Sequence, residues 1–368
     1  MEIVKEFNWK VDPTGFQALD WNEGGAELSV EGIEYEVNPS PYSLGCELES
    51  ELAGAGTLHD LDQLDCSGKV LLLHGDLAKE QLMPKNFIFF NPEEHQQIIA
   101  SLEKKNPAAI ICATSRNASL AGGVYPFPLI EDGDFDIPSV FMTEEEGVKL
   151  LSNIGKQTRL ISRTRRIQGI AYNLIARKGG ASSKRIAISA HIDAKIGTPG
   201  AIDNATGVIV LLLLAELMRD YNGKFALELL PFNGEDYYAA PGQMIYLDQN
   251  QDHWDDILLN INIDGAGYYL GESALSPFNL PLDIQQGVDS LIQNHKGISE
   301  GIPWVQGDHS IFLQQGIPAI AFSSQWFIHN IDSQAVTHTP KDHPGIVDCE
   351  KVVEIAKAIQ ELINGIVS

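Results

Sequence analysis

Two kinds of apolar run alternate along the C-terminal half of the chain. Short continuous runs rich in Ile, Leu, Val and Ala predict strands, and longer runs with apolar residues three and four positions apart predict helices. From about Arg185 onward the runs are RIAISAHID, GVIVLLLLAELMRDY, FALELLPFNGED, DDILLNINIDGAG, IPAIAFSS and KVVEIAKAIQELI. Because strands and helices alternate, we expect an α/β domain whose mostly parallel central sheet is flanked by helices on both faces.

Two of these runs predict helices, one of them buried and the other amphipathic. The run from Val208 to Leu214 is followed closely by Glu216 and is shorter than the roughly 18 residues needed to cross a bilayer, so it predicts a buried helix. The last run has apolar residues at helical spacing, with Asp348 placed to cap its start and Gly365 near its end. It predicts an amphipathic C-terminal helix.

The middle of the chain has a different pattern. Short strand-like runs (KVLLLHG, AAIICAT, IPSVFMT) are separated by Pro, Gly and Asn clusters and by one helix-like stretch, HQQIIASLEKK. We expect a smaller, β-rich α/β insert domain at residues 39–165, between an N-terminal part of the main domain at 1–38 and the rest of it at 166–368. A length of 368 residues agrees with two domains. The acidic stretch LIEDGDFDIP predicts a solvated loop of the insert rather than a calcium site.

The charge balance excludes some partners. The chain has 25 Lys plus Arg and 50 Asp plus Glu, a formal net charge of −25. Such a charge repels phosphate groups, so we expect no nucleic-acid partner and no anionic membrane partner. The first residues lack the apolar stretch of a secretion signal, and the four cysteines form no C-x-x-C pair. Both observations favour a cytoplasmic location, and the oligomeric state is left open.

Histidines and acidic residues follow the predicted strands at several places. Ligand sites in open α/β sheets form where the carboxyl ends of the strands meet, so we expect these side chains to lie together. A carboxylate after a run as apolar as ILLNINI is costly to desolvate unless it binds a partner such as a metal ion. The residues are His191, Asp193 and Asp203 in AHIDAKIGTPGAIDNATG, Glu235 and Asp236 in FNGED, Asp264 in ILLNINIDGAG, and His338 and Asp342 in THTPKDHP.

This set of residue types favours a centre with two metal ions. Two imidazoles and three carboxylates suffice for two cations if one carboxylate bridges them. Mixed nitrogen and oxygen ligands suit Zn²⁺, with Co²⁺ or Mn²⁺ as substitutes. In the acid pair of FNGED, one carboxylate would bind a metal and the other would handle protons. A carboxylate usually orients a metal-bound histidine, a role that is within reach of Asp193 for His191 and of Asp342 for His338.

The motifs H-x-D, P-G-A-x-D-N-x-x-G, an acid pair, N-x-D-G and H-T-P-x-D together resemble the metallopeptidase family that contains zinc aminopeptidases and glutamate carboxypeptidase. Their order and spacing both match, over about residues 165–368. The resemblance implies a zinc-exopeptidase fold and peptide substrates that are cleaved at the N-terminal residue. By pattern alone, residues 40–165 are similar to the protease-associated domain that this family often carries.

The resemblance implies a role for each matching position. It makes Glu235 the general base, which we count with Asp193 as catalytic, and it implies a cis peptide between Asp203 and Asn204. It also implies two zinc ions per chain that share Asp203 as a bridge, with His191, Asp203 and Asp264 as ligands of one ion and Asp203, Asp236 and His338 as ligands of the other.

Two positions depart from the family pattern. Asp236 replaces a glutamate that is more common in the acid pair, and Thr337 stands where several members carry a tyrosine that supports the tetrahedral intermediate. The oxyanion would then depend on the metal or on another tyrosine, such as Tyr237, Tyr238 or Tyr268.

Other readings of the sequence stay open. A carboxypeptidase or dipeptidase would use the same metal residues, although the scarcity of arginine near the motifs favours recognition of an amine. A binding protein that keeps the fold without activity is the alternative from another class, and the complete set of ligands counts against it. The pair Asp308 and His309 in GDHSIF either lines the substrate cleft or stabilises a turn before a helix.

Overall fold

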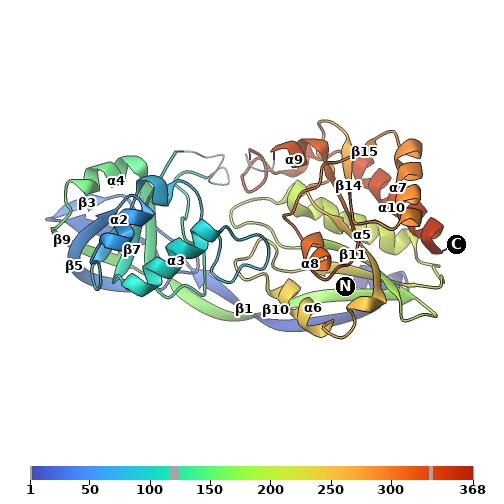
Figure 1. The fold of residues 1–368 in the computed structure, drawn as a ribbon, viewed down its shortest axis with the longest axis horizontal. Coiled ribbons are helices and arrows are strands. Elements are labelled where there is room, and N and C mark those ends of the chain that lie inside the picture. The colour runs from blue at the N-terminus through green and yellow to red at the C-terminus, as the bar shows by residue number, and fades with distance from the viewer. Residues whose placement is uncertain (1, 117–123, 331–334, 368) are drawn as a thin grey trace. The chain divides into compact units, whose positions relative to one another are not determined.

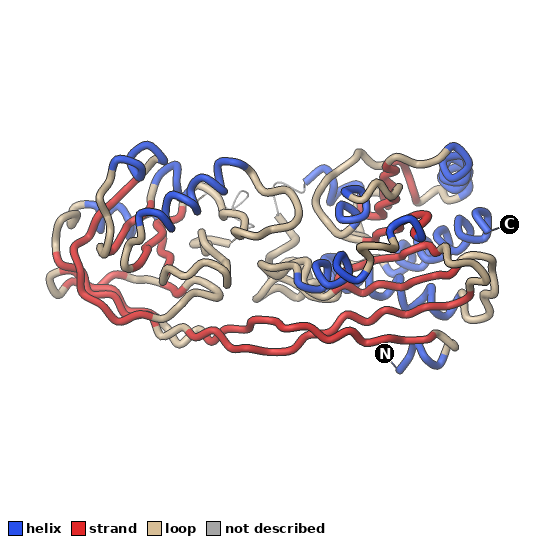
Figure 2. The backbone as a smooth tube through the Cα atoms, turned by 60° about the horizontal axis from the view of Figure 1, so that its bottom comes forward, coloured by secondary structure: helices blue, strands red, loops and turns tan. Residues whose placement is uncertain are grey.

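The computed structural model describes residues 2–116, 124–330 and 335–367. The chain divides into two compact units (Figure 1). The first unit contains Met1–Phe16, Ala171–Ile331 and Val336–Ser368, and Gln17–Ile170 form the main part of the second. The chain leaves the first unit within strand β1 (Lys10–Asn22) and returns within strand β10 (Arg165–Gly179), and these two long strands are neighbours (Figure 2).

The first unit is built on an eight-stranded mixed sheet in the order β1-β10-β12-β11-β13-β16-β14-β15. Its four central strands are parallel, whereas β10 and β14 run antiparallel to their inner neighbours. The predicted α/β fold class with a mostly parallel centre is confirmed. The strands after β10 are β11 (Arg185–His191), β12 (Ala226–Phe232), β13 (Ile257–Ile263), β14 (Ser273–Phe278), β15 (Ile298–Glu300) and β16 (Ala319–Ser324).

One face of this sheet packs on three helices to form the main core. The helices are α5 (Thr206–Leu217), α7 (Leu282–Asn294) and α10 (Cys349–Val367). Strands contribute every second residue, such as Ile186 and Ile188 of β11 and Leu259 and Ile261 of β13. The predicted buried helix is α5, and the predicted C-terminal helix is α10, where the Asp348 carboxylate accepts a hydrogen bond from the Glu350 N–H (3.0 Å).

The intervening residues of the central strands face the other way and are partly polar. Ser189 of β11 donates to the Asn262 side-chain oxygen (2.8 Å) and accepts from the Asn260 side-chain nitrogen (3.0 Å). Helices α6 (Pro241–Gln249) and α8 (His309–Gln314) pack on this face, where Tyr246 lies against Phe232. Because strand residues alternate, His191 lies on this second face, directly beyond Ser189.

The second unit has its own eight-stranded sheet, in the order β3-β2-β9-β5-β6-β7-β8-β4. The strand-like and helix-like runs of the middle region are present as β6 (Val70–Leu73), β7 (Ala109–Thr114), β8 (Ser139–Thr143) and α3 (Glu93–Lys105). The sheet also contains β2 (Ala26–Val30), β3 (Ile33–Tyr35), β4 (Asn38–Pro39), β5 (Cys46–Ala55) and β9 (Gln157–Ser162). The remaining elements of the chain are α1 (Glu2–Glu6), α2 (Leu58–Gln63), α4 (Glu144–Leu151), α9 (Gln325–Asn330) and short helical turns at Gly75–Ala78, Ala201–Ala205, Trp254–Asp256 and Pro344–Ile346.

The acidic stretch of the second unit is not the solvated loop that we expected. Glu131 and Asp132 are buried. Asp132 accepts hydrogen bonds from the backbone N–H groups of Asp134 (2.7 Å) and Lys85 (2.8 Å), and Glu131 accepts from the Gln81 side chain (2.9 Å). The carboxylates are buried because donors within the protein replace water around them.

Two further observations concern the environment of the chain. Cys46, Cys66, Cys112 and Cys349 are all free thiols. Within residues 2–116, 124–330 and 335–367, no helix has the length and apolar character required to cross a bilayer. The cytoplasmic location stays a prediction.

Candidate metal centre

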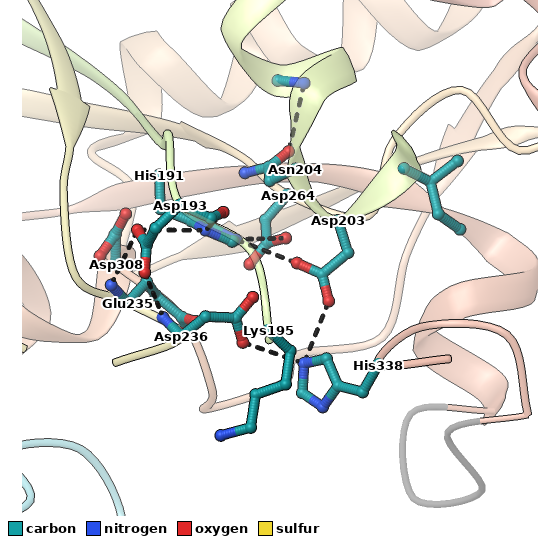
Figure 3. Close-up of polar contacts among 12 residues, drawn as sticks. His191, Asp193, Lys195, Asp203, Asn204, Glu235, Asp236, Asp264, Asp308 and His338 are labelled. Carbon is teal, nitrogen blue, oxygen red and sulfur yellow. Dashed lines mark hydrogen bonds and ion pairs between the residues drawn. The ribbon is translucent and has the colours of Figure 1, made fainter. Parts of the chain in front are cut away.

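The first ligand-bearing segment is the end of β11. His191 is almost fully buried, and its Nδ1 lies 3.0 Å from the backbone carbonyl oxygen of Asp193. A carbonyl oxygen only accepts, so Nδ1 carries the proton and the Nε2 of a neutral ring presents a lone pair. That Nε2 lies 3.1 Å from Asp203 Oδ1 and 3.5 Å from Asp264 Oδ1, with no hydrogen bond of acceptable geometry (Figure 3). Three lone-pair atoms therefore converge, which suits a cation.

Asp203 sits in a distorted turn that the D-N-x-x-G motif explains. The peptide between Asp203 and Asn204 is cis, as the family resemblance implied. The Asn204 side chain donates to the Ile263 carbonyl (2.8 Å) and accepts from the Gly207 N–H (3.1 Å). A side chain at Gly207 would collide with the Asn204 side chain, so the glycine of the motif makes room for this contact. The turn is thereby tied to the end of β13, directly before Asp264.

The second segment is the strand-exit turn after β12, which carries Glu235 and Asp236. One carboxylate oxygen of Asp193 accepts from the backbone N–H groups of Gly234 (2.7 Å) and Glu235 (3.2 Å), and the other accepts from that of Asp236 (3.0 Å). Asp193 therefore fixes the backbone that presents the acid pair. Its contact with the ring of His191 is through the backbone carbonyl, since its carboxylate is 3.8 Å from Nδ1.

The third segment brings in His338, whose backbone has a positive φ of 58°. Its Nε2 lies 3.2 Å from Asp203 Oδ2 and 3.0 Å from Asp236 Oδ1. The two oxygens of Asp203 thus face two different histidines (Figure 3). Three groups of ligand atoms result, each within 4.8 Å. Two contain Asp203, one with His191 and Asp264 and one with Asp236 and His338, and the third consists of His191, Glu235 and Asp236.

Asp342 does not lie against the ring of His338 in the way that the sequence suggested. Its two carboxylate oxygens accept from the backbone N–H groups of Ile202 (2.7 Å) and Asp203 (3.1 Å). Burial raises the pKa of Asp342 to about 6. Asp342 therefore holds the Asp203 turn, as Asp193 holds the turn with the acid pair.

The electrostatics of the centre are dominated by excess negative charge. Burial opposes a charge on His191 and His338, yet the surrounding carboxylates raise the pKa of each imidazole well above its usual value. Burial raises the pKa of Glu235 well above its usual value, and it also raises the pKa of Asp264. Burial likewise opposes ionisation of Asp203, but the two histidines lower its pKa. A divalent cation would supply the positive charge that this cluster lacks.

Asp308 and His309 both lie in the buried part of this region, at the start of α8. The Asp308 carboxylate accepts from the side chain of Gln243 (2.7 Å), and burial raises its pKa to about 7. His309 donates from Nε2 to the Trp304 carbonyl (2.9 Å). Figure 3 shows Asp308 behind Glu235, on the side of His191 and Asp193. Gln243 was not predicted as part of the site, because a glutamine in a helix-like stretch has no distinctive pattern.

The tyrosines considered for the oxyanion occupy different surroundings. Tyr268 packs against Trp326, with ring centroids 4.6 Å apart, and Tyr237 packs against Tyr238 at the same centroid distance. Thr337, which the resemblance places where several family members carry a tyrosine, is buried and directly precedes His338.

The fold and this centre define an α/β protein with a histidine and carboxylate site suited to metal ions. The profile of peptidase family M28 matches residues 173–363, more than half of the 368-residue chain, so the chain belongs to that family. It is a metal-dependent peptidase. The family match begins after residues 39–165, for which the likeness to a protease-associated domain stays a prediction.

Solved structures resemble the chain over almost its whole length. An aminopeptidase from Aneurinibacillus sp. strain AM-1 has a TM-score of 0.74 at 20% identity, covering 98% of this chain and 85% of its own. A zinc aminopeptidase from Bacillus subtilis has a TM-score of 0.72 at 18% identity, covering 100% and 87%. A peptidase M28 precursor from Shewanella amazonensis SB2B has a TM-score of 0.66 at 15% identity, covering 99% and 85%. These likenesses establish the fold, and no curated protein matches the chain in sequence.

Proposed function

We propose that the protein is an aminopeptidase that uses two zinc ions, bridged by Asp203, to remove the N-terminal residue of peptides. The observation that carries the proposal is that the two carboxylate oxygens of Asp203 face the Nε2 atoms of His191 and His338, at 3.1 and 3.2 Å. Each histidine has a second carboxylate of its own, Asp264 or Asp236. Two adjoining ligand groups that share one carboxylate are the arrangement of two-metal hydrolases.

The donor atoms fit zinc. Each group combines one imidazole nitrogen with carboxylate oxygens, and Zn²⁺ accepts both kinds of ligand, with Co²⁺ or Mn²⁺ as substitutes. Three of the atoms, His191 Nε2, Asp236 Oδ2 and Asp264 Oδ1, are buried without a hydrogen-bond partner among the described residues. A buried acceptor without a donor is costly, and a bound cation removes that cost. The zinc aminopeptidase of Bacillus subtilis, which shares the fold, adds support.

The chain's own residues supply the proton chemistry. When bound, the ions contribute Lewis acidity and make water a stronger nucleophile at neutral pH. Glu235 lies outside the two groups that contain Asp203, and with His191 and Asp236 it forms the third group. Burial raises the pKa of Glu235 well above its usual value, which makes it a better proton acceptor. We assign it the role of taking the proton of the attacking water and passing it to the leaving amine. Asp193 positions Glu235 by holding its backbone N–H.

The alternatives differ in what the site recognises. A carboxypeptidase would best hold the terminal carboxylate of its substrate with the paired donors of an arginine. The segments 191–207, 233–243, 264–272, 304–310 and 336–343 contain two lysines and no arginine. A dipeptidase would require both termini to be held. A binding protein without activity would not need both ligand groups and a base. These points favour the aminopeptidase.

The experiment compares free and N-blocked peptides in the presence of zinc. We expect hydrolysis of leucyl-p-nitroanilide and of free peptides, no hydrolysis of N-acetylated peptides, and about two zinc ions per chain by elemental analysis. Hydrolysis of N-acetylated peptides from the carboxyl end would contradict N-terminal action. A maximum of one ion per chain at saturating zinc would contradict the bridged centre.

A further inference from the structure

The acid pair lies in the segment 233–242, which runs from the end of β12 into the start of α6. The segment closes on itself, because the Gly242 N–H donates to the Asn233 carbonyl (3.2 Å). A side chain at Gly234, whose φ is 127°, would come within 2.5 Å of the Pro241 ring. The two ends of the segment are therefore packed closely together, and the acid pair lies in the turn between them.

The side chain of Asn173, in β10, joins both ends of this segment. Asn173 is buried, its side-chain oxygen accepts from the Asn233 N–H (3.2 Å), and its side-chain nitrogen donates to the Gly242 carbonyl (2.7 Å). The backbone pairing of β10 with β12 extends as far as Ala176 and Leu229. Because a primary amide has the donor and the acceptor of a peptide group, the Asn173 side chain continues the contact between the two chain segments beyond that point.

The glycine at position 242 makes room for this arrangement. A side chain there would lie 2.4 Å from the Asn173 side-chain oxygen and 2.5 Å from the Asn233 carbonyl oxygen. The planar amide of Asn173 holds its donor and its acceptor in one rigid group, so it fixes the distance between the two ends. A buried backbone group that loses such a partner is costly, which favours a single position of the segment.

We propose that Asn173 is a positioning residue, which sets the place of Glu235 by fixing the two ends of the segment 233–242. The inference rests on the proposed role of Glu235 as the base. Asp193 holds the backbone N–H groups at the acid pair itself, whereas Asn173 holds the ends from which that turn rises. A shift of about 1 Å in a catalytic group can lower a rate roughly a hundredfold.

The test is the kinetics of Asn173→Ala at saturating zinc, since Asp236 lies on the same segment and its displacement would weaken zinc binding. We expect kcat for leucyl-p-nitroanilide to fall roughly ten- to hundredfold, with KM within about threefold and wild-type zinc content. Asn173→Asp serves if the alanine variant does not fold. It keeps the shape and the acceptor, but its carboxylate cannot donate to the Gly242 carbonyl, so kcat should also fall.

A double-mutant cycle connects the loss to the base. If Asn173 acts through Glu235, Asn173→Ala should lower the residual rate of Glu235→Gln by less than about threefold. A loss as large as that in the wild type would show that Asn173 acts independently of Glu235 and would overturn the inference.

The matched control is Asn250→Ala. Asn250 is also buried, and its side chain donates to the Tyr246 carbonyl (2.8 Å) at the other end of α6. The control should lose stability and keep kcat. An equal loss of kcat in the control, or wild-type kcat in a folded Asn173 variant, would contradict the positioning role. If Glu235→Gln is inactive while the Asn173 variants are fully active, only this inference fails, whereas full activity of Glu235→Gln would contradict the proposed mechanism itself.

Discussion

In the part of the chain that the structure describes, Asp236 and Asp264 of the first unit each bury a carboxylate oxygen that accepts no hydrogen bond, whereas the buried Asp132 of the second unit has both oxygens occupied by backbone N–H donors. Both regions have acidic residues close together in sequence or in space. They differ in whether the surrounding protein provides hydrogen-bond donors to the buried carboxylates. Among the described residues, every group of three ligand side chains with atoms within 4.8 Å of one another lies in the first unit.

This difference shows how a buried acid should be interpreted. Burial alone raises the pKa of Asp132, as it does that of Asp264, so burial and pKa do not separate a structural carboxylate from a metal ligand. A metal ligand is distinguished from a structural carboxylate by an oxygen atom that has no hydrogen-bond donor and that lies near the lone pair of an imidazole nitrogen. His309 is an instructive third case: within residues 2–116, 124–330 and 335–367, its buried Nδ1 has no hydrogen-bond partner and belongs to none of the ligand groups.

The largest effect is expected at Glu235, the proposed general base. Glu235→Gln should lower kcat by roughly 10² to 10⁴, because the amide cannot take a proton, while zinc content stays at the wild-type level. Glu131→Gln in the second unit is the matched control, since Glu131 is a buried glutamate whose carboxylate accepts from Gln81. Turnover of the folded control should be unchanged. If Glu235→Gln had the turnover of the wild type, Glu235 would not be the general base.

A smaller effect is expected at the two carboxylates that hold the ligand turns. Asp193→Asn and Asp342→Asn each replace an acceptor oxygen that faces a backbone N–H, so both should weaken zinc binding roughly ten- to hundredfold in a chelator competition. Asp193→Asn should in addition lower kcat at saturating zinc, because its turn carries Glu235. If kcat fell equally in both variants, Asp193 would have no special link to the base.

The third prediction concerns His309, whose pKa burial lowers to about 4. In the unfolded chain this histidine binds a proton below about pH 6.5, while in the folded protein it stays neutral until about pH 4. Its contribution to stability is therefore present at neutral pH and lost as the pH falls from 6.5 to 4, by about 3 kcal/mol. Urea unfolding of wild type and His309→Gln at pH 7 and pH 4.5 isolates this contribution. A constant difference between the two proteins would contradict it.

The smallest effect is expected at Asp132. Asp132→Asn loses a charged acceptor for one of two backbone N–H groups, so the free energy of unfolding should fall by about 1–3 kcal/mol. We expect kcat/KM and zinc affinity of the folded variant to be unchanged, as measured by peptide hydrolysis and chelator competition. A loss of zinc affinity would show that the contrast between the two acidic regions is not valid.

Much of the fold could be predicted because its signals are local. The apolar runs at 186–190 and 257–263 became parallel strands, and the ends of parallel strands meet at one edge, which is why His191, Asp236 and Asp264 converge. The glycine at 207 was part of a motif, and the structure supplies its physical reason in the contact with Asn204.

The direction of side chains could not be predicted in the same way. The spacing H-x-D brings Asp193 close to His191, but the residue between them lets either the carbonyl or the carboxylate face the ring. Asp342 likewise lies near His338 in sequence and holds a different turn. The burial of Asp132 depends on the N–H of Lys85, which is far away in the sequence and therefore invisible to any local pattern.

The position of Asp203 between two histidines has a thermodynamic consequence. In the proposed two-zinc centre, Asp203 belongs to both ligand groups, so occupation of either group would change the charge and the orientation that the other group experiences. Zinc titration should then follow two linked steps rather than two independent isotherms, and removal of the Asp203 carboxylate should abolish the linkage. The shared carboxylate of Asp203 would thus couple zinc binding at the two ligand groups.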